Sequence, residues 1–308
     1  MYIGLILWIF MSSIIYHYCS PDGFFKIIET KTLRLTDTCF MNDTSEGLLF
    51  RAYFQEWIYN KIQCPKELKD KIFESVFVNT EPSLVRAFCT CFSREVNSLN
   101  MWKNYTNQCQ GFAIGFNTSL LTPLTNTMPR MMAGNSIRLS LLDVVYSKEK
   151  VMSILDNQLR SLIESADRIH KYDNDAFSLI LQCISICSEF LSPAVKHPCF
   201  GEEHEVRLIY KPLDVCAAGT PSEKVCFQGE QKSVAGMEKL SVSNVRFLAD
   251  KTGLRQFYNL DFSQMPELIR EVHVGANNMT RPETLSLFLH KNGITPELFK
   301  QIQPVRRE

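Results

Sequence analysis

Two short polar clusters interrupt apolar, strand-like stretches of the chain and carry side chains that could do chemistry. They lie at residues 16–20, with the sequence YHYCS, and at residues 203–207, with the sequence EHEVR. On a strand, Glu203 and Glu205 would point to one face of the sheet and share it with Arg207. Paired carboxylates can raise each other's pKa for acid–base work, bind a divalent cation, or accept hydrogen bonds from a ribose. A charge ladder on a solvated edge strand is the plainer interpretation, and both stay open.

The first cluster is equally ambiguous. His17 lies between two tyrosines in an apolar run, where a histidine either fills a satisfied core position or acts on a ligand. The sequence contains no Gly-rich phosphate loop, nucleophile elbow, His-Glu-x-x-His run or calcium loop. The common nucleotide-binding and hydrolase motifs therefore give no help.

The elements that must position these clusters follow from hydrophobic periodicity. Strands and helices are interspersed without regular alternation, which favours an α+β protein with a mixed, curved sheet over a doubly wound fold. We expect one domain over residues 1–308, with a helical insertion at about 148–195 and a C-terminal helical segment at about 280–303. The pattern predicts strands over 32–36, 84–92, 111–116, 137–146, 206–210, 242–248, 257–262 and 271–274, and helices over 45–62, from 65, from 151 and over 176–191.

Charge and cysteine content limit the partners and the compartment. Lysine plus arginine equals aspartate plus glutamate at 33 each, so net charge provides no attraction to nucleic acid or anionic membrane. The 11 cysteines are odd in number and lack the paired spacing of a disulfide framework or a zinc site. We expect free thiols, a cytoplasmic location and no bound metal.

The first 15 residues are almost wholly apolar. No basic residue precedes them and no small-residue cleavage site follows, and a bilayer span needs about 20 apolar residues. This favours a buried strand or helix that leads into the first cluster. The apolar run at 176–191 is interrupted by polar residues and reads as a buried helix, so no stable membrane partner is expected.

Six motifs, taken in order, resemble one bacterial and phage family, the domain of unknown function 2971. The resemblance runs from about Tyr16 to Gly275, and Cys19 stands where the family usually has a threonine after His-Tyr. The motifs are YHYCS at 16–20, Leu33-x-Leu35, Asn42-Asp43-x-x-Glu46, Phe88 to Ser93 with Trp102, GFAIGF at 111–116 and Glu203-x-Glu205-x-Arg207.

The opening of that family is in turn similar to the start of ADP-ribosyltransferase-type domains. This similarity implies a split sheet and NAD as a co-substrate, without a metal. By position it implies that Glu205, or less favourably Glu203, is the catalytic carboxylate and that His17 orients NAD. A fixed carboxylate would stabilise the positive charge that develops on the sugar. The other cofactor-binding candidates are Tyr18 and Tyr105, as stacking rings, and Arg34, as a diphosphate contact.

Three functions remain open at this level. The first is an ADP-ribosyltransferase-like enzyme that acts on a protein or nucleic-acid acceptor, in conflict between phage and host. The second is a non-catalytic interaction or regulatory module, which Cys19 in place of threonine favours. The third is a metal-dependent hydrolase or nuclease, although neutral net charge argues against a nuclease. Its Mg²⁺ ligands would be Asp43, Glu46, Glu203 and Glu205.

Overall fold

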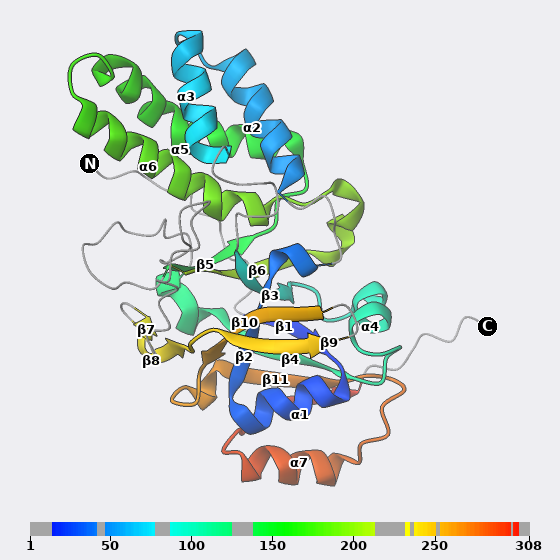
Figure 1. Ribbon diagram of the computed structural model, residues 1–308. Coiled ribbons are helices and arrows are strands. Elements are labelled where there is room, and N and C mark those ends of the chain that lie inside the picture. Colours follow the sequence, from blue (N-terminus) through cyan, green and yellow to red (C-terminus); the bar gives the residue numbers. More distant parts are fainter. Residues whose placement is uncertain are drawn as a thin grey trace.

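The protein is α+β, as predicted, with a large sheet between two groups of helices (Figure 1). The computed structural model describes residues 14–41, 47–77, 87–124, 138–212, 232–234, 237–250, 253–296 and 298–301. Every strand pair in these ranges is antiparallel except β11 with β12, so the sheet is mixed but mostly antiparallel.

The described part of the chain contributes 12 strands to one sheet. The main path runs β12-β11-β4-β1-β3-β2-β10-β8-β7, with β6 paired to β3 and β5, and β9 paired to β10. The strands are β1 (Ile14–Cys19), β2 (Thr32–Asp37), β3 (Phe88–Ser93), β4 (Phe112–Asn117), β5 (Arg138–Asp143), β6 (Glu205–Lys211), β7 (Lys232–Val234), β8 (Met237–Val242), β9 (Arg246–Asp250), β10 (Gly253–Asp261), β11 (Ile269–Val274) and β12 (Leu298–Gln301).

Helices cover both sides of this sheet. The α-helices are α1 (Pro21–Thr30), α2 (Leu48–Lys61), α3 (Lys66–Phe77), α4 (Leu99–Tyr105), α5 (Lys148–Ile169), α6 (Asn174–Leu191) and α7 (Pro282–Lys291). The 3-10 segments are η1 (Thr38–Phe40), η2 (Thr118–Leu124), η3 (Ser192–Ala194), η4 (Pro198–Glu203) and η5 (Pro266–Leu268).

One sheet face packs on α1 and α7, and their apolar residues form the main core. Two residues fix the start of helix α1. Pro21 occupies its first turn, and Ser20 Oγ caps it by accepting a hydrogen bond from Gly23 N at 3.1 Å. Its buried stripe includes Phe24, whose ring stacks on Phe112 of β4 at 3.9 Å between centroids. We call this apolar side of the sheet the core face.

A second core lies within the helical layer above the sheet, where α2, α3, α5 and α6 pack on one another. The layer comes from two segments, 48–77 and 148–191, and the second falls within the expected insertion. Residues of α5 at helical spacing, from Val151 to Ala166, are buried against the neighbouring helices. Trp57 of α2 donates to Asp156 of α5 at 2.7 Å and ties the two segments together.

Among the described residues, one helical stretch, Asn174–Ala194, has the length and hydropathy of a membrane span. Within it, 44% of the apolar window is buried, and α6 packs on α3 and α5. Core helices of folded domains meet the same criteria, so length and composition alone are weak evidence for a span.

Strand β3 is the branch point of the sheet. One of its edges pairs with β6 along its whole length, from Phe88 opposite Tyr210 to Ser93 opposite Glu205. Its other edge is shared, because Tyr16 of β1 pairs with Ser93 at one end and Thr36 of β2 pairs with Cys89 at the other. The face opposite the core face carries Tyr16, Thr36, Cys91 and Glu205, and we call it the polar face.

Two segments differ from the sequence-based expectation, and one cannot be compared. Of the segment expected to form a helix from Thr295-Pro296-Glu297, the described residues 298–301 form a strand instead, since they pair in parallel with β11 as β12. The single strand expected over 242–248 is bent, because residues 243–245 separate β8 from β9. The apolar start of the chain lies outside the described residues as far as residue 13.

Candidate functional site

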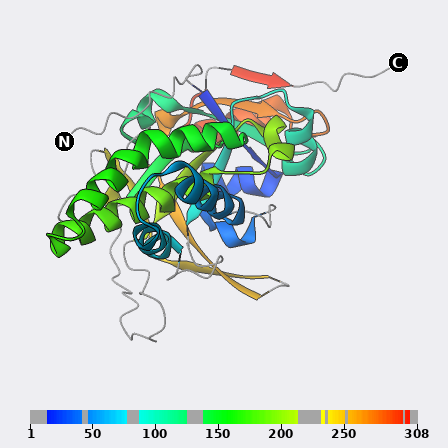
Figure 2. The ribbon, with the colours of Figure 1, turned by 90° about the horizontal axis from the view of Figure 1, so that it is seen from above.

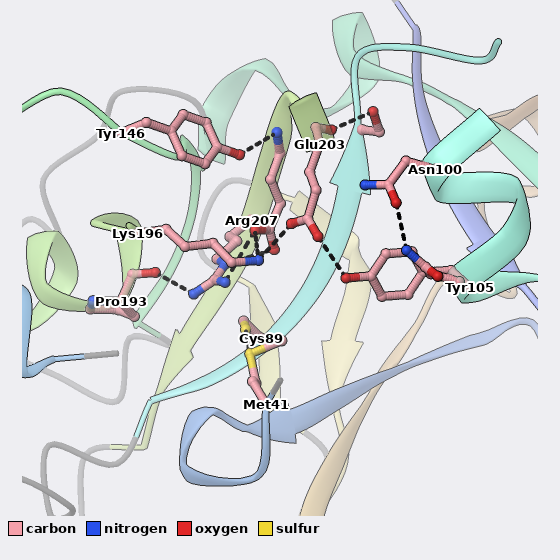
Figure 3. Close-up of polar contacts among 12 residues, drawn as sticks. Met41, Cys89, Asn100, Tyr105, Tyr146, Pro193, Lys196, Glu203 and Arg207 are labelled. Carbon is pink, nitrogen blue, oxygen red and sulfur yellow. Dashed lines mark hydrogen bonds and ion pairs between the residues drawn. The ribbon is translucent and has the colours of Figure 1, made fainter. Parts of the chain in front are cut away.

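Four buried charged side chains meet where β6 adjoins η3 and η4 (Figure 3). Lys196 Nζ lies 2.5 Å from Glu203 Oε2 and 3.2 Å from Glu205 Oε2. Arg207 donates from Nε to Glu205 Oε1 at 2.8 Å and from Nη2 to Oε2 at 3.1 Å, which is a bidentate pair. Each of the four is at most 5% exposed. We call Lys196, Glu203, Glu205 and Arg207 the buried quartet.

The two glutamates converge by a route that differs from the expected one. Glu203 ends η4, and His204 adopts a left-handed conformation with φ of 44°, so β6 begins only at Glu205. The expectation that both carboxylates stand on one strand was therefore wrong, although Arg207 does share a strand face with Glu205. Both carboxylates reach one ammonium group because the turn at His204 brings Glu203 back over the start of β6.

The edge-strand interpretation of this cluster was also wrong. Strand β6 lies between β3 and β5, and every residue from Glu205 to Lys211 is buried. Arg207 uses its remaining Nη1 to donate to the carbonyl of Pro193 in η3 at 2.7 Å. The quartet therefore fastens the sheet to the end of the helical layer.

Hydrogen bonds from α4, from β3 and from the segment between β5 and α5 fix the orientation of the glutamates. Tyr105 of α4 donates to Glu203 Oε1 at 2.8 Å, and Ser93 of β3 donates to the carbonyl of Glu203 at 2.7 Å. The hydroxyl of Tyr146 accepts from Glu205 N at 3.0 Å. Sequence reasoning identified Tyr105 but missed Lys196 and Tyr146. A lysine directly after the apolar pair Ala194-Val195 was the available signal for a buried cation.

Opposite charges in the quartet shift the pKa values of Glu205 and Lys196. Burial raises the pKa of Glu205, but Arg207 and Lys196 outweigh burial and hold that pKa below its usual value. Burial likewise lowers the pKa of Lys196, and the two glutamates reverse this, so its pKa lies above the usual lysine value. A contact with Cys89, together with burial and nearby Glu205, raises the pKa of Cys91 well above that of a free thiol. Near neutral pH Glu205 is thus ionised and Lys196 is protonated.

This charge state makes stability dependent on pH at the acid end. A carboxyl group whose pKa is depressed on folding stabilises the native state above the unfolded pKa, about 4.3. That stabilisation is lost as pH falls through the folded pKa. We expect the free energy of unfolding, measured in urea at about pH 7 and about pH 3, to fall more for wild type than for Glu205→Gln/Arg207→Met. Equal falls would show that Glu205 is not held ionised by the quartet.

His17 lies apart from the quartet. Pairing of Tyr16 with Ser93 puts the tyrosines of β1 on the polar face and turns His17 to the core face, where its ring meets Phe92 edge-on at 5.8 Å. Its Nδ1 is 2.9 Å from the carbonyl of Cys91, and burial lowers its pKa. His17 and Glu205 therefore point to opposite faces of the sheet, and their assignment to one NAD cleft stays a prediction that these contacts do not favour.

The remaining cofactor candidates share the polar face but have other partners. Tyr18 donates to the carbonyl of Glu95 at 2.6 Å and packs edge-on against Trp102, with centroids 5.2 Å apart. Arg34 is exposed, and its guanidinium lies over the ring of Phe257 at 4.6 Å. Only Tyr105, Glu203 and Glu205 of the candidate site residues are joined by the hydrogen bonds of the quartet.

No group of three or more metal-ligating side chains suited to a metal occurs among the described residues. The carboxylates of Glu203 and Glu205 are close together, but ammonium and guanidinium groups occupy the space between and beside them. Asp43 and Glu46, the other ligands of the metal hypothesis, lie outside the described residues. Eight cysteines are described as free thiols, which agrees with the expected lack of a disulfide framework in that part of the chain.

Comparison with known proteins gives one match, and it covers this cluster. No curated protein and no solved structure matches the chain significantly. A family model does match, over residues 101–208, and it is described as Protein of unknown function (DUF2971). The motifs of β1, β2 and β3 fall outside this range, so the resemblance there stays a prediction. Over residues 101–208, which contain the whole buried quartet with Tyr105 and Tyr146, the chain is similar to this family of proteins of unknown function.

Proposed function

We propose that this protein is a non-catalytic interaction or regulatory module in which the buried quartet is a structural lock. The observation that carries the proposal is the internal neutralisation of both carboxylates. Glu205 has one oxygen on Arg207 and the other on Arg207 and Lys196. Glu203 has one oxygen on Tyr105 and the other on Lys196. A carboxylate that must stabilise a substrate cation would have to give up such partners, at a large cost in a buried site.

What the lock holds in place is a rim of exposed residues. Ser93 and Tyr105 attach Glu203 to both ends of the segment 94–104, and Arg94 N donates to the carbonyl of His204 at 3.0 Å. The rim consists of residues 95–100 and 202–204, apart from buried Glu203. Its exposed members are Glu95, Asn97, Leu99, Asn100, Glu202 and His204. A preorganised rim loses little conformational entropy on binding, which suits recognition of a partner protein.

Leu99 is the apolar anchor of this proposed surface. Its side chain is 57% exposed at the first turn of α4, and carboxylates of Glu95 and Glu202 are exposed on the same rim. A protein partner with a small apolar pocket bordered by basic side chains would match this chemistry.

A second candidate, the ADP-ribosyltransferase-like enzyme, is supported by one specific arrangement. Tyr18, Arg34 and Glu205 share the polar face, and the sheet branches at β3 in a way compatible with a split sheet. In this alternative NAD lies on the polar face, a carboxylate of the quartet stabilises the oxocarbenium-like charge, and the acceptor is a macromolecule.

One experiment separates the two candidates. Wild type, Glu205→Gln and the matched variant Glu202→Gln, whose carboxylate is exposed, are incubated with NAD labelled in the nicotinamide ring. We expect no nicotinamide release and no saturable NAD binding by any of them. Release by wild type and Glu202→Gln, but not by Glu205→Gln, would replace the interaction module with the enzyme.

The interaction proposal has its own readout. We expect immobilised wild type and immobilised Tyr172→Asp to retain the same partner protein. Tyr172→Asp changes an exposed ring on the helical layer, away from the rim. The rim variant Leu99→Asp should retain at least about ten-fold less, because a charge enters the apolar anchor. Equal retention by the two variants would show that the rim is not the recognition surface.

A further inference from the structure

Strand β9 forms an arm that projects from the sheet with β10 (Figure 2). Strands β8 and β9 lie end to end along one edge of β10, and Ser243 at the bend donates from N to the carbonyl of Asn259 at 2.9 Å. The outer edge of β8 is paired with β7. In the described part of the chain, β9 pairs with β10 alone, so its outer edge is unpaired.

The base of the arm is held in place from the polar face. Arg34 of β2 lies over the ring of Phe257, and the guanidinium of Arg255 lies 4.6 Å from the ring centroid of Phe40. Residues 257–261 of β10 are also paired with β2 over their whole length. The arm is thus a continuation of the sheet and presents its outer edge in a fixed direction.

The arm exposes more apolar surface than an edge strand normally does. Residues 246–249 of β9 are all exposed, and Phe247 is 54% exposed. Leu254 of β10, opposite Ala249 on the same face as Phe247, is 67% exposed. Unpaired edges with exposed apolar side chains are templates for pairing with another strand, and proteins usually block them.

We propose that β9 pairs with β9 of a second copy of this chain, antiparallel and about a two-fold axis at Leu248. The sequence of β9, Arg-Phe-Leu-Ala-Asp, is complementary to its own reverse. Antiparallel pairing centred on Leu248 sets Arg246 opposite Asp250 of the other copy, twice by symmetry. Charges of opposite sign directly across an antiparallel pair stabilise it, and like charges destabilise it.

The apolar residues are complementary in the same register. Leu248 meets Leu248 of the second copy on one face. On the other face Phe247 falls opposite Ala249 of the second copy, where the small side chain leaves room for the ring. The Phe247 ring of one copy would also cover Leu254 of the other copy, because Leu254 of β10 lies opposite Ala249. A two-fold axis makes this contact isologous, so it closes at a dimer and does not extend into a fibre.

Charge reversal tests the register. Sedimentation equilibrium of the full chain should show a monomer–dimer equilibrium for wild type. Arg246→Asp and Asp250→Arg should each raise the dissociation constant by about ten-fold or more, because each places like charges opposite one another twice. The double variant Arg246→Asp/Asp250→Arg should return the constant to within about three-fold of wild type, since it restores both pairs.

Arg281→Asp serves as the matched control, because it reverses an exposed arginine at the start of α7 and should leave the dissociation constant unchanged. Circular dichroism and thermal melting of all variants check that the fold is retained. A monomer at every concentration would overturn the proposal. A dimer whose constant does not respond to either single reversal, or a double variant no better than the singles, would overturn the register and with it the β9 interface.

Discussion

Replacing Arg207 with methionine should lower the free energy of unfolding by about 3–5 kcal/mol, because it leaves Glu205 buried without its bidentate partner. The guanidinium is fully buried, and it donates two hydrogen bonds to Glu205 and one to the carbonyl of Pro193. Lys196 remains, but it is shared with Glu203. Domains of ordinary stability have about 5–15 kcal/mol in total, so urea or guanidinium unfolding at neutral pH will resolve the loss.

Two further variants show whether the unpaired charge is the cause. Lys26→Met breaks the exposed pair of Lys26 with Asp22, and should cost at most about 1 kcal/mol. Glu205→Gln in the Arg207→Met background removes the uncompensated charge and should recover part of the loss. If Arg207→Met costs no more than Lys26→Met, the quartet is not the lock between sheet and helices.

Much of the fold could be predicted because local patterns determine it. Period-two alternation located β2, strand-like apolar runs located β4 and β6, and helical spacing located α5. The misses came where tertiary pairing overrides local preference. Thr295-Pro296 has the form of a helix start, yet the residues after it pair with β11. The bend between β8 and β9 depends on Ser243 bonding to Asn259, which no window of sequence reveals.

The site was harder to predict than the fold, for a reason visible in His17. Alternation along a strand shows that His17 and Tyr18 point to opposite faces. Which of the two shares a face with Glu205 depends on the register between β1, β3 and β6, and a shift by one residue would exchange them. The motif alone brought His17 and Glu205 together, whereas the pairing of Tyr16 with Ser93 separates them.

Lys196 illustrates a second limit. Two buried carboxylates and one buried arginine leave an unbalanced charge, so a second cation was required once Glu203 and Glu205 were known to be buried. Burial was the missing fact, since Glu-x-Glu-x-Arg also suits a solvated strand. The sequence could therefore state the alternatives but not choose between them. The ambiguity between a buried and a solvated position does not arise at a glycine where two backbone segments touch.

Gly111, at the start of β4, is such a position and gives the second large expected effect. A Cβ on Gly111 would lie 2.0 Å from the carbonyl oxygen of Cys19 at the end of β1, and backbone cannot move aside as a flexible side chain can. Gly111→Ala should therefore force β1 and β4 apart and lower the free energy of unfolding by about 3 kcal/mol or more. Chemical denaturation with fluorescence detection will measure it.

Gly201 in η4 is the matched control, because a Cβ there would meet nothing within 4 Å. Gly201→Ala should change the free energy of unfolding by less than about 1 kcal/mol. Alanine in place of glycine also lowers the conformational entropy of the unfolded chain, which favours the folded form. Gly275 should behave like Gly111, since its Cβ would lie 2.3 Å from the carbonyl oxygen of Cys109. A Gly111→Ala protein as stable as Gly201→Ala would mean that β1 and β4 do not approach this closely.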